Sequence, residues 1–428
     1  MVKEMLTGNY AAAWGARLSE VDYVPAFPIT PQTEIIETLS QWINDGVMNA
    51  KFTNMDSEHS MITAAGTAAA TGARVFSATS SQGLLYGYEM LYNVTGWRVP
   101  LVLINVSRGL SAPITLEPDH NDILSTRDSG FVQIHAETCQ EILDTILMAY
   151  RIAEDERVLL PVLINMDGFY LSFTREPVEI PDKDEVSKFL PEYNPKHAFF
   201  KASNPMSQGV AVLGGSVYSY FKYQMHLASL NVLTVHDEVA GDFKRIFGRS
   251  YSAVESFKMD DADHVIIMSN SFTIKGKAAV NKFREKGLKV GLLRLRLIRP
   301  FPYKELKTLL NGKKAVAVID QNISPGSGGI LFNDVTTALY HEPDRPERIL
   351  SFIGGLGGKN ISHAEFNHIV EEMEKSIETG IVPETQLLYT KGDLEQINNL
   401  LNIAGKTTAN AGVKPVPISW TLIPHTPL

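Results

Sequence analysis

Three segments carry residue types that could bind an anion or move a proton. The first is Phe27–Thr33, which leaves an expected strand and enters an expected helix. With Thr30 as the N-cap and Pro31 as the first helical residue, backbone N–H groups and a hydroxyl would face the end of the sheet. Such a helix start can bind a carboxylate. Ordinary helix capping explains the same residues and is the favoured interpretation on local sequence alone.

The second segment opens with an acidic residue. Glu58 lies in Asp56–Ser60, and the thirteen residues that follow contain eight Ala or Gly, so we expect a closely packed, buried helix. An acid at this position can simply complement the helix dipole. In a buried position its pKa would rise, and it could share a proton with a cofactor. The local sequence leaves both interpretations open.

The third segment is a loop that follows an expected buried strand. Arg108 ends the strand, and the loop over residues 114–130 has no obvious secondary structure. Long loops in this position more often form part of an active site than a simple connection. Arg108 could hold a carboxylate through two parallel hydrogen bonds. Pairing with Asp119 or Asp128 is an equally good interpretation.

Several other features point away from catalysis. His120 lies between two aspartates, but a solvated loop histidine is a better interpretation than a metal ligand, and we expect no metal site on this chain. The glycine runs Gly326–Gly329 and Gly355–Asn360 lack the spacing of phosphate-binding loops. Cys139 is the only cysteine, which excludes an internal disulfide and any iron–sulfur cluster ligated by this chain alone.

Alternating apolar strands and helices must position these residues. Strands that are apolar throughout and separated by helices indicate parallel sheets covered on both faces. We therefore predict an α/β protein with two parallel-sheet domains, at 1–190 and 205–355, joined by a proline-rich linker at 191–204. A C-terminal helix and tail follow at 356–428. The expected strands are 23–27, 73–78, 101–106, 131–136, 158–165, 209–215, 264–270, 289–296 and 315–320; the expected helices are 31–44, 84–95, 140–153, 275–286, 303–310 and 363–379.

Composition narrows the class of protein. The chain has 428 residues, 44% of them hydrophobic and 20% charged, as is usual for folded globular proteins. The formal net charge is −9, and no basic stretch could follow a phosphate backbone, so nucleic acid is a poor candidate partner. The N-terminus is too polar for a signal peptide, and no apolar run is long enough to span a membrane. We expect a cytoplasmic protein that does not bind membranes.

Taken together, the motifs resemble a known family. The segments FPITP, DSEH, TSSQGL, SRGLSAP, PDHND and TRDSGF, and later MDGFYLS, DDADHVIIM, KVGLLRLRLIRPFP, AVAVIDQNIS and GGLGGKNIS, occur in this order. In order and spacing they resemble the alpha subunit of the 2-oxoacid:ferredoxin oxidoreductases, the pyruvate enzymes especially. The resemblance covers about the first 370 residues.

The resemblance implies an enzyme divided between subunits. The two expected domains would be a pyrimidine-binding domain for thiamin diphosphate and a transketolase-C-terminal-like domain. A beta subunit would supply the diphosphate and Mg²⁺ ligands, since Met166–Gly168 and Asn398–Asn399 lie too far apart to form that motif here. Iron–sulfur clusters on ferredoxin-like gamma and delta subunits would pass electrons to ferredoxin or another acceptor. Coenzyme A would accept the acyl group.

Individual residues receive roles from the same resemblance. Glu58 matches the glutamate that shares a proton with the pyrimidine ring of the cofactor, and Ser81 and Gln82 are further candidates for cofactor contact. Thr30 and Arg108 match residues that hold the substrate carboxylate. The residues expected to shape the rest of the substrate pocket are Phe27, Pro28, Glu117, Asp119 and His120.

The chain also departs from the pyruvate enzymes. It has Phe27 where they have Tyr, and Leu116–Pro118 where they often have Trp or Gly and Asp. The overall resemblance makes pyruvate the default substrate. Because of these departures, an aryl 2-oxoacid such as phenylglyoxylate is the alternative. Oxalate-oxidising relatives also vary in this region. A subunit with only a structural, docking role and a free-standing thiamin enzyme are the remaining alternatives.

Overall fold

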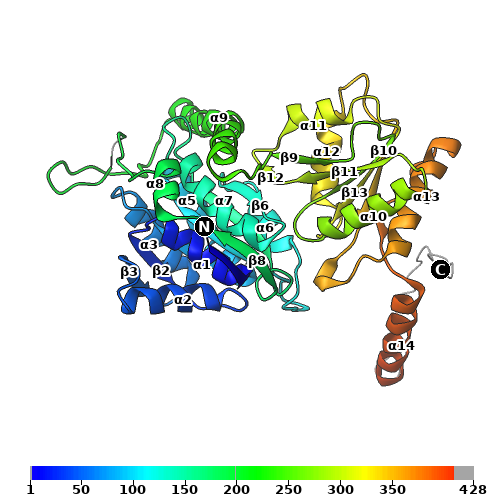
Figure 1. The fold of residues 1–428 in the computed structure, drawn as a ribbon, viewed down its shortest axis with the longest axis horizontal. Coiled ribbons are helices and arrows are strands. Elements are labelled where there is room, and N and C mark those ends of the chain that lie inside the picture. Colours follow the sequence, from blue (N-terminus) through cyan, green and yellow to red (C-terminus); the bar gives the residue numbers. More distant parts are fainter. Residues whose placement is uncertain (1, 198, 409–428) are drawn as a thin grey trace.

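A sheet of short apolar strands lies at the centre of the first half of the chain (Figure 1). The computed structural model describes residues 2–197 and 199–408, and it orders this five-stranded sheet β12-β6-β7-β5-β4. The first four strands along the chain run parallel to one another, whereas β12 pairs antiparallel with β6. The strands are β4 (Phe76–Thr79), β5 (Val102–Ser107), β6 (Val132–His135), β7 (Val162–Asp167) and β12 (Leu297–Arg299).

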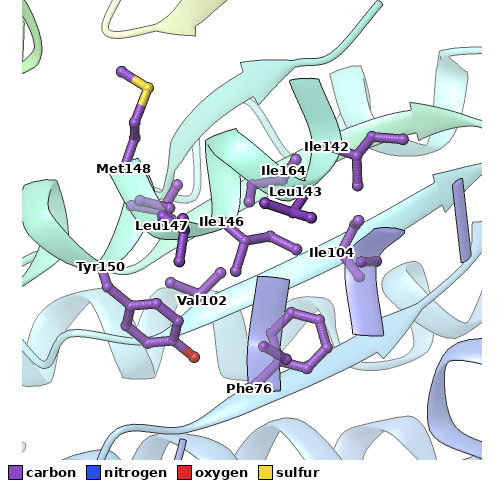
Figure 2. Close-up of a cluster of buried hydrophobic side chains, with 14 of the residues drawn as sticks. Phe76, Val102, Ile104, Ile142, Leu143, Ile146, Leu147, Met148, Tyr150 and Ile164 are labelled. Carbon is purple, nitrogen blue, oxygen red and sulfur yellow. The ribbon is translucent and has the colours of Figure 1, made fainter. Parts of the chain in front are cut away.

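Both faces of this sheet are apolar because helices pack on each of them, with α7 on one face. Its side chains Ile142, Leu143, Ile146 and Leu147 repeat at helical spacing and pack on β4, β5 and β7 in one buried cluster (Figure 2). Helices α3 and α5 contribute to a second cluster with Leu103 and Leu163, whose side chains point the other way. The helices are α1 (Gly8–Leu18), α2 (Thr33–Asn44), α3 (Glu58–Ala69), α4 (Ser81–Tyr86), α5 (Tyr88–Trp97), α6 (Asn121–Ser125), α7 (Cys139–Ala153) and α8 (Lys183–Phe189).

Two small sheets extend the first unit. β2 (Tyr23–Ala26) pairs parallel with β3 (Lys51–Asn54), and a bridge between Tyr23 and Val75 joins β2 to the start of β4. The Ser77 hydroxyl, in β4, donates to the Pro25 carbonyl at 2.7 Å. β2, β4 and β5 therefore end at one edge, where the first and third candidate segments begin. On the other side of the unit, β1 (Val2–Thr7) pairs antiparallel with β8 (Arg175–Ile180).

The second half of the chain builds a six-stranded sheet in the order β15-β14-β13-β10-β11-β9. All of its pairs are parallel except β9 with β11. The expected α/β class with two parallel-sheet units is confirmed. The strands are β9 (Val254–Phe257), β10 (His264–Met268), β11 (Val290–Leu295), β13 (Ala315–Asp320), β14 (Arg348–Ile353) and β15 (Gln386–Leu387); the helices are α10 (Thr273–Glu285), α11 (Tyr303–Leu310), α12 (Ile330–Leu339), α13 (His363–Thr379) and α14 (Lys391–Thr408).

The segment between the two sheets differs from the prediction. The strand expected at 209–215 is wrong: residues 209–214 form no strand, and the long helix α9 (Gly215–Phe247) follows. Val232, Val235, Val239 and Phe243 of α9 belong to the buried cluster of the first unit. Its first half instead exposes apolar and aromatic side chains, namely Val217, Tyr218, Tyr220, Phe221 and Tyr223. The domain limits at 190 and 205 stay a prediction, and the packing of α9 joins its second half to the first unit.

The C-terminal region contains more structure than expected. The helix at 363–379 is present as α13, and the expected tail then adds β15 to the edge of the sheet and forms α14, which extends away from it (Figure 1). Residues 409–428 of the expected tail, and residue 198 of the expected linker, lie outside the described residues. In the part of the chain that the structure describes, no helix combines the length and apolarity needed to cross a bilayer.

Candidate cofactor and substrate site

Glu58 is the first residue of α3, as the sequence predicted. The Ser57 hydroxyl caps this helix by accepting the Ser60 N–H at 3.2 Å. The Glu58 side chain is buried, with 5% of its surface exposed, and this burial raises the pKa of its carboxyl. A carboxyl with a raised pKa can hold a proton nearer to neutral pH, which is the property needed to share one with a ring nitrogen.

The carboxyl of Glu58 faces a glycine in α4. A Cβ atom on Gly83 would lie 2.4 Å from Glu58 Oε1 and 2.8 Å from Thr79 Oγ1, so a larger residue here would displace the Glu58 carboxyl. The Thr79 hydroxyl is buried and has no hydrogen-bond partner among the described residues. The Glu58 carboxyl and the unsatisfied Thr79 hydroxyl thus both lie beside Gly83, which has no side chain. This arrangement fits the polar edge of a pyrimidine ring.

Arg108 is anchored at the end of β5 and is buried, with 6% exposure. Its Nε donates to the Thr30 carbonyl at 2.7 Å, and its Nη1 donates to Gln82 Oε1 at 2.8 Å. Among the described residues, Arg108 forms no ion pair with Asp119 or Asp128, the pairing that the sequence left open. No described residue accepts from Nη2. The guanidinium therefore keeps hydrogen-bonding capacity for a substrate carboxylate.

Thr30 does not cap a helix, which corrects the sequence prediction. α2 begins at Thr33 with Gln32 as its N-cap residue, and Pro31 lies before the helix rather than in its first turn. The Gln32 amide donates to the Phe27 carbonyl at 2.9 Å and so closes a turn that the sequence pattern did not indicate. The Thr30 residue is exposed, and its contribution within the chain is the carbonyl that orients Arg108.

Ser81 and Gln82 link Arg108 to Glu58. Ser81 Oγ donates to Gln82 Oε1 at 2.8 Å and to the Gly109 carbonyl at 3.2 Å. The Gln82 amide nitrogen is buried and has no partner among the described residues. Because Gln82 contacts Arg108 and its neighbour Gly83 faces Glu58, the expected acid and the expected anion-binding arginine lie on opposite sides of a single turn of α4.

Asp122 is a site residue that sequence reasoning missed. Its buried carboxylate accepts the Ser81 N–H at 3.1 Å, the Arg108 N–H at 3.4 Å and the Asn105 amide at 3.0 Å. Ser81 has a φ of 47°, a backbone conformation that is unfavourable for serine, and the bond to Asp122 stabilises it. The PDHND motif contains Asp122, but the sequence does not show that its side chain points back into the fold.

The expected substrate loop is more ordered than the sequence indicated. Residues 121–125 form α6, and His120 is buried rather than solvated. Its Nε2 lies 2.7 Å from Asp167 Oδ1. Burial opposes protonation of His120, but Asp167, Asp122 and Asp119 together outweigh this effect and raise the pKa of the imidazole. His120 is therefore buried and paired behind the loop rather than solvated. Its expected place in the substrate pocket stays a prediction.

The other loop residues remain candidates for the pocket. Phe27 is half-buried against the second apolar cluster, and Pro28 is exposed. Glu117 and Asp119 are half-buried, and burial raises the pKa of the Asp119 carboxyl. The Glu117 carbonyl accepts the Gly109 N–H at 3.2 Å, which places Glu117 beside the strand end that carries Arg108.

Two protein-family models match the chain. The family model described as pyruvate flavodoxin/ferredoxin oxidoreductase, thiamine diphosphate-binding, matches residues 14–240. A second model, pyruvate:ferredoxin oxidoreductase core domain II, matches residues 262–366. The chain belongs to the pyruvate:ferredoxin oxidoreductase family. The resemblance, the fold and the enzyme class expected from the sequence are thereby confirmed, and thiamin diphosphate is the cofactor of the matched region.

Named relatives cover most of the chain. It is 40% identical over 381 residues to pyruvate synthase subunit PorA of Pyrococcus furiosus, which is 89% of this chain and 96% of the relative. Pyruvate synthase subunit PorA of Methanothermobacter thermautotrophicus is 37% identical over 374 residues, 87% of this chain and 96% of the relative. Ketoisovalerate oxidoreductase subunit VorA of Pyrococcus horikoshii is 39% identical over 380 residues, 89% of this chain and 95% of the relative. Relatives of near-equal identity thus carry two different substrate names.

Solved structures support the fold. The 2-oxoglutarate:ferredoxin oxidoreductase of Magnetococcus marinus superposes with a TM-score of 0.65 at 17% identity. That match covers 88% of this chain and 65% of the neighbour, so this chain spans about two thirds of that protein. A split-gene transketolase superposes with a TM-score of 0.50 at 11% identity, covering 88% of this chain and 98% of the other. At these identities the likeness describes the fold alone.

Proposed function

We propose that the chain is the alpha subunit of a cytoplasmic complex that oxidatively decarboxylates pyruvate. In the overall reaction the 2-oxoacid loses CO₂, its acyl group passes to coenzyme A, and two electrons leave through iron–sulfur clusters on partner subunits. The observation that carries this proposal is the single turn of α4 that joins the buried acid Glu58 to Arg108 through Gly83 and Gln82. A carboxylate-binding group beside a proton-sharing acid is what this reaction requires.

This chain's residues would hold a proton at the cofactor and bind the negative charge of the substrate carboxylate. Thiamin diphosphate, when bound, supplies the carbanion chemistry that decarboxylation of a 2-oxoacid needs. Glu58 would hold a proton at the pyrimidine ring nitrogen, and its buried position favours the protonated form. Arg108 would orient the substrate carboxylate, with its own position fixed by the Thr30 carbonyl and by Gln82. The closed packing of α3 against α4 and α5 would limit access of water to Glu58.

The substrate is proposed from the relatives and from the loop. Pyruvate is the default, because most of the relatives described above are named pyruvate synthase subunits. The ketoisovalerate relative supports a branched 2-oxoacid as a second candidate. Phenylglyoxylate remains an alternative because of Phe27 and Glu117. We assign the choice between these substrates to Phe27, Pro28, Glu117 and Asp119, which lie next to the groups that would hold the carboxylate.

Partner subunits complete the proposed complex. A beta subunit would bind the diphosphate and Mg²⁺, and gamma and delta subunits would carry the clusters that reduce ferredoxin or another acceptor. The word subunit in the relatives' names supports assembly into a complex, and the coenzyme A bound in the Magnetococcus neighbour supports that co-substrate. Exposed aromatic side chains on the first half of α9 also support burial against another chain.

The direct test is purification of the native complex with a tag on this chain. We expect partner chains with a thiamin diphosphate motif and with ferredoxin-like clusters, and pyruvate oxidation that depends on coenzyme A and an electron acceptor. Parallel assays with 2-oxoisovalerate and phenylglyoxylate would rank the substrates. A complex that oxidises none of the three would contradict the proposal, and an active complex that tolerates loss of Glu58 and Arg108 would favour a docking role.

A further inference from the structure

The glycine run Gly355–Asn360 lies against the substrate loop of the other unit. It follows β14 at the carboxyl end of the second sheet, and Gly355, Gly357 and Gly358 have φ values of 83°, 59° and 74°. Side-chain-bearing residues rarely adopt such values. The sequence showed that this run does not match a phosphate-binding loop. Its glycines instead allow a tight backbone path beside residues 115–118.

Gly358 makes the closest contacts along this path. Its N–H is shared between the Gly355 carbonyl at 3.1 Å and the Pro118 carbonyl at 3.3 Å, and its own carbonyl accepts the Tyr170 hydroxyl at 3.2 Å. A Cβ atom on Gly358 would lie 2.9 Å from both Cβ and Oε2 of Glu117. The position of Glu117 therefore depends on the absence of a side chain at residue 358. Glu117 is in turn bonded through its carbonyl to Gly109, the neighbour of Arg108.

A second connection holds the other end of the same loop. The His120 N–H donates to the Gln321 carbonyl, at the end of β13, at 2.9 Å. The His120 ring pairs with Asp167, whose carboxylate also accepts the Ser271 N–H at 3.1 Å and the Asn270 amide at 3.0 Å. Ser271 and Asn270 precede α10 in the second unit. Hydrogen bonds thus join both ends of the segment 117–120 to the second unit, and those of Asp167 at the His120 end are buried.

We propose that Gly358 is a specificity-determining positioning residue, through which the second unit sets the shape of the substrate pocket. This inference rests on the proposed function, in which Glu117 selects among 2-oxoacids. Both the N–H and the carbonyl of Gly358 form hydrogen bonds, and its Cα packs directly against the Glu117 side chain. A loop that only filled space would need neither feature. The second unit, which carries neither Glu58 nor Arg108, acquires a role in substrate choice.

The experiment uses the complete complex and compares Gly358→Ala with Gly357→Ala. Both positions have positive φ, so both variants carry backbone strain, but a Cβ on Gly357 meets only a Thr115 methyl at 3.7 Å. We expect Gly358→Ala to change the ratio of kcat/KM for pyruvate to that for 2-oxoisovalerate by about tenfold or more, the scale on which a pocket discriminates single methylene groups. Gly357→Ala should leave this ratio within about twofold.

A second measurement reports on position rather than turnover. Amide hydrogen exchange over residues 115–120 should accelerate in Gly358→Ala and not in Gly357→Ala. In a Glu117→Gly background, where the contact with the new methyl group is removed, Gly358→Ala should no longer change the substrate ratio. If Gly358→Ala fails to assemble, Tyr170→Phe takes its place, since it removes the bond to the Gly358 carbonyl, and it should shift the ratio in the same direction.

The outcomes separate this inference from the proposed function. A wild-type complex that oxidises no 2-oxoacid would contradict the proposed function. A wild-type complex that is active, with Gly358→Ala or Tyr170→Phe leaving both the ratio and the exchange unchanged, would overturn the positioning role alone. An equal loss of kcat/KM for both substrates in Gly358→Ala and Gly357→Ala would also overturn it, because backbone strain would then explain the effect.

Discussion

At the scale of residues, the candidate site depends on two ionisable side chains, Glu58 and Arg108, that the fold removes from water. Burial of an ionisable side chain is costly unless it is partnered or functional. Arg108 is partnered by a carbonyl and an amide oxygen rather than by a carboxylate, and Glu58 faces an unsatisfied hydroxyl and a bare glycine Cα. These arrangements leave hydrogen-bonding capacity for molecules outside the chain.

Replacement of Glu58 tests its role as a proton-sharing acid. Glu58→Gln is nearly isosteric, so the complex should assemble normally, while turnover should fall by about 10²–10⁴-fold, the usual contribution of general acid–base groups. Steady-state kinetics measures the loss. Glu89→Gln is a matched control, because the Glu89 side chain lies on the exposed face of α5, and it should leave turnover unchanged. A loss below about tenfold for Glu58→Gln would assign the carboxyl a structural role.

Replacement of Arg108 tests substrate anchoring. Arg108→Lys keeps the charge but loses the planar fork, so kcat/KM should fall for every 2-oxoacid, whatever its side chain. Glu117→Ala should instead change the ratio between substrates. Kinetics with pyruvate, 2-oxoisovalerate and phenylglyoxylate distinguishes the two variants. If Arg108→Lys affected one substrate only, or Glu117→Ala left all ratios unchanged, the assignment of anchor and selector would be wrong.

At the scale of elements, β13 ends in a buried acid, Asp320, that makes stability depend on pH. Asp320 accepts the N–H groups of Leu331 and Phe332 at 2.7 and 3.0 Å, yet burial raises its pKa to about 7. The unfolded chain releases this proton near its ordinary value, about pH 3.9. The folded state therefore binds one more proton between these two values, and stability falls as the pH rises through this window.

Asp320→Asn should remove this loss of folding stability at higher pH. The melting temperature of the variant complex, relative to wild type, should rise as the pH increases from 5 to 8, and the gain should level off above about pH 7. In free energy the full effect is at most about 4 kcal/mol. Differential scanning calorimetry at several pH values measures it. A difference that is flat or that falls with pH would mean that the two helix N–H groups keep Asp320 ionised.

Elements whose residues repeat with a clear period could be predicted from the sequence, and those fixed by tertiary contacts could not. α13 and α11 have the expected bounds, because their apolar residues follow the helical period. The apolar run at 209–215 has the composition of a strand but no neighbouring strand to pair with. Similarly, the position of Glu58 at a helix start could be predicted from the sequence. Other features depend on tertiary contacts that the local sequence does not show: the turn at Thr30, the burial of His120 and the inward carboxylate of Asp122.

At the scale of the whole molecule, strand pairing and a shared buried cluster join the two halves of the chain, and in the proposed function this chain builds only part of the active site. β12 of the later sequence pairs with β6 in the first sheet, and one buried cluster contains Leu103 together with Leu293 and Phe301 from the second half. In the proposed function, the residues described above would bind the pyrimidine side of the cofactor and the substrate carboxylate. The diphosphate and Mg²⁺ are assigned to a second chain.

Titration calorimetry with thiamin diphosphate and Mg²⁺ tests this division most directly. The folded chain alone should show no binding, or binding much weaker than that of the reconstituted complex, because in the proposed function Glu58 and its neighbours would contact only the ring end of the cofactor. Addition of the proposed beta subunit should restore tight binding, and Glu58→Gln in that complex should weaken turnover far more than affinity. Tight, Mg²⁺-dependent binding by the isolated chain would contradict the shared site.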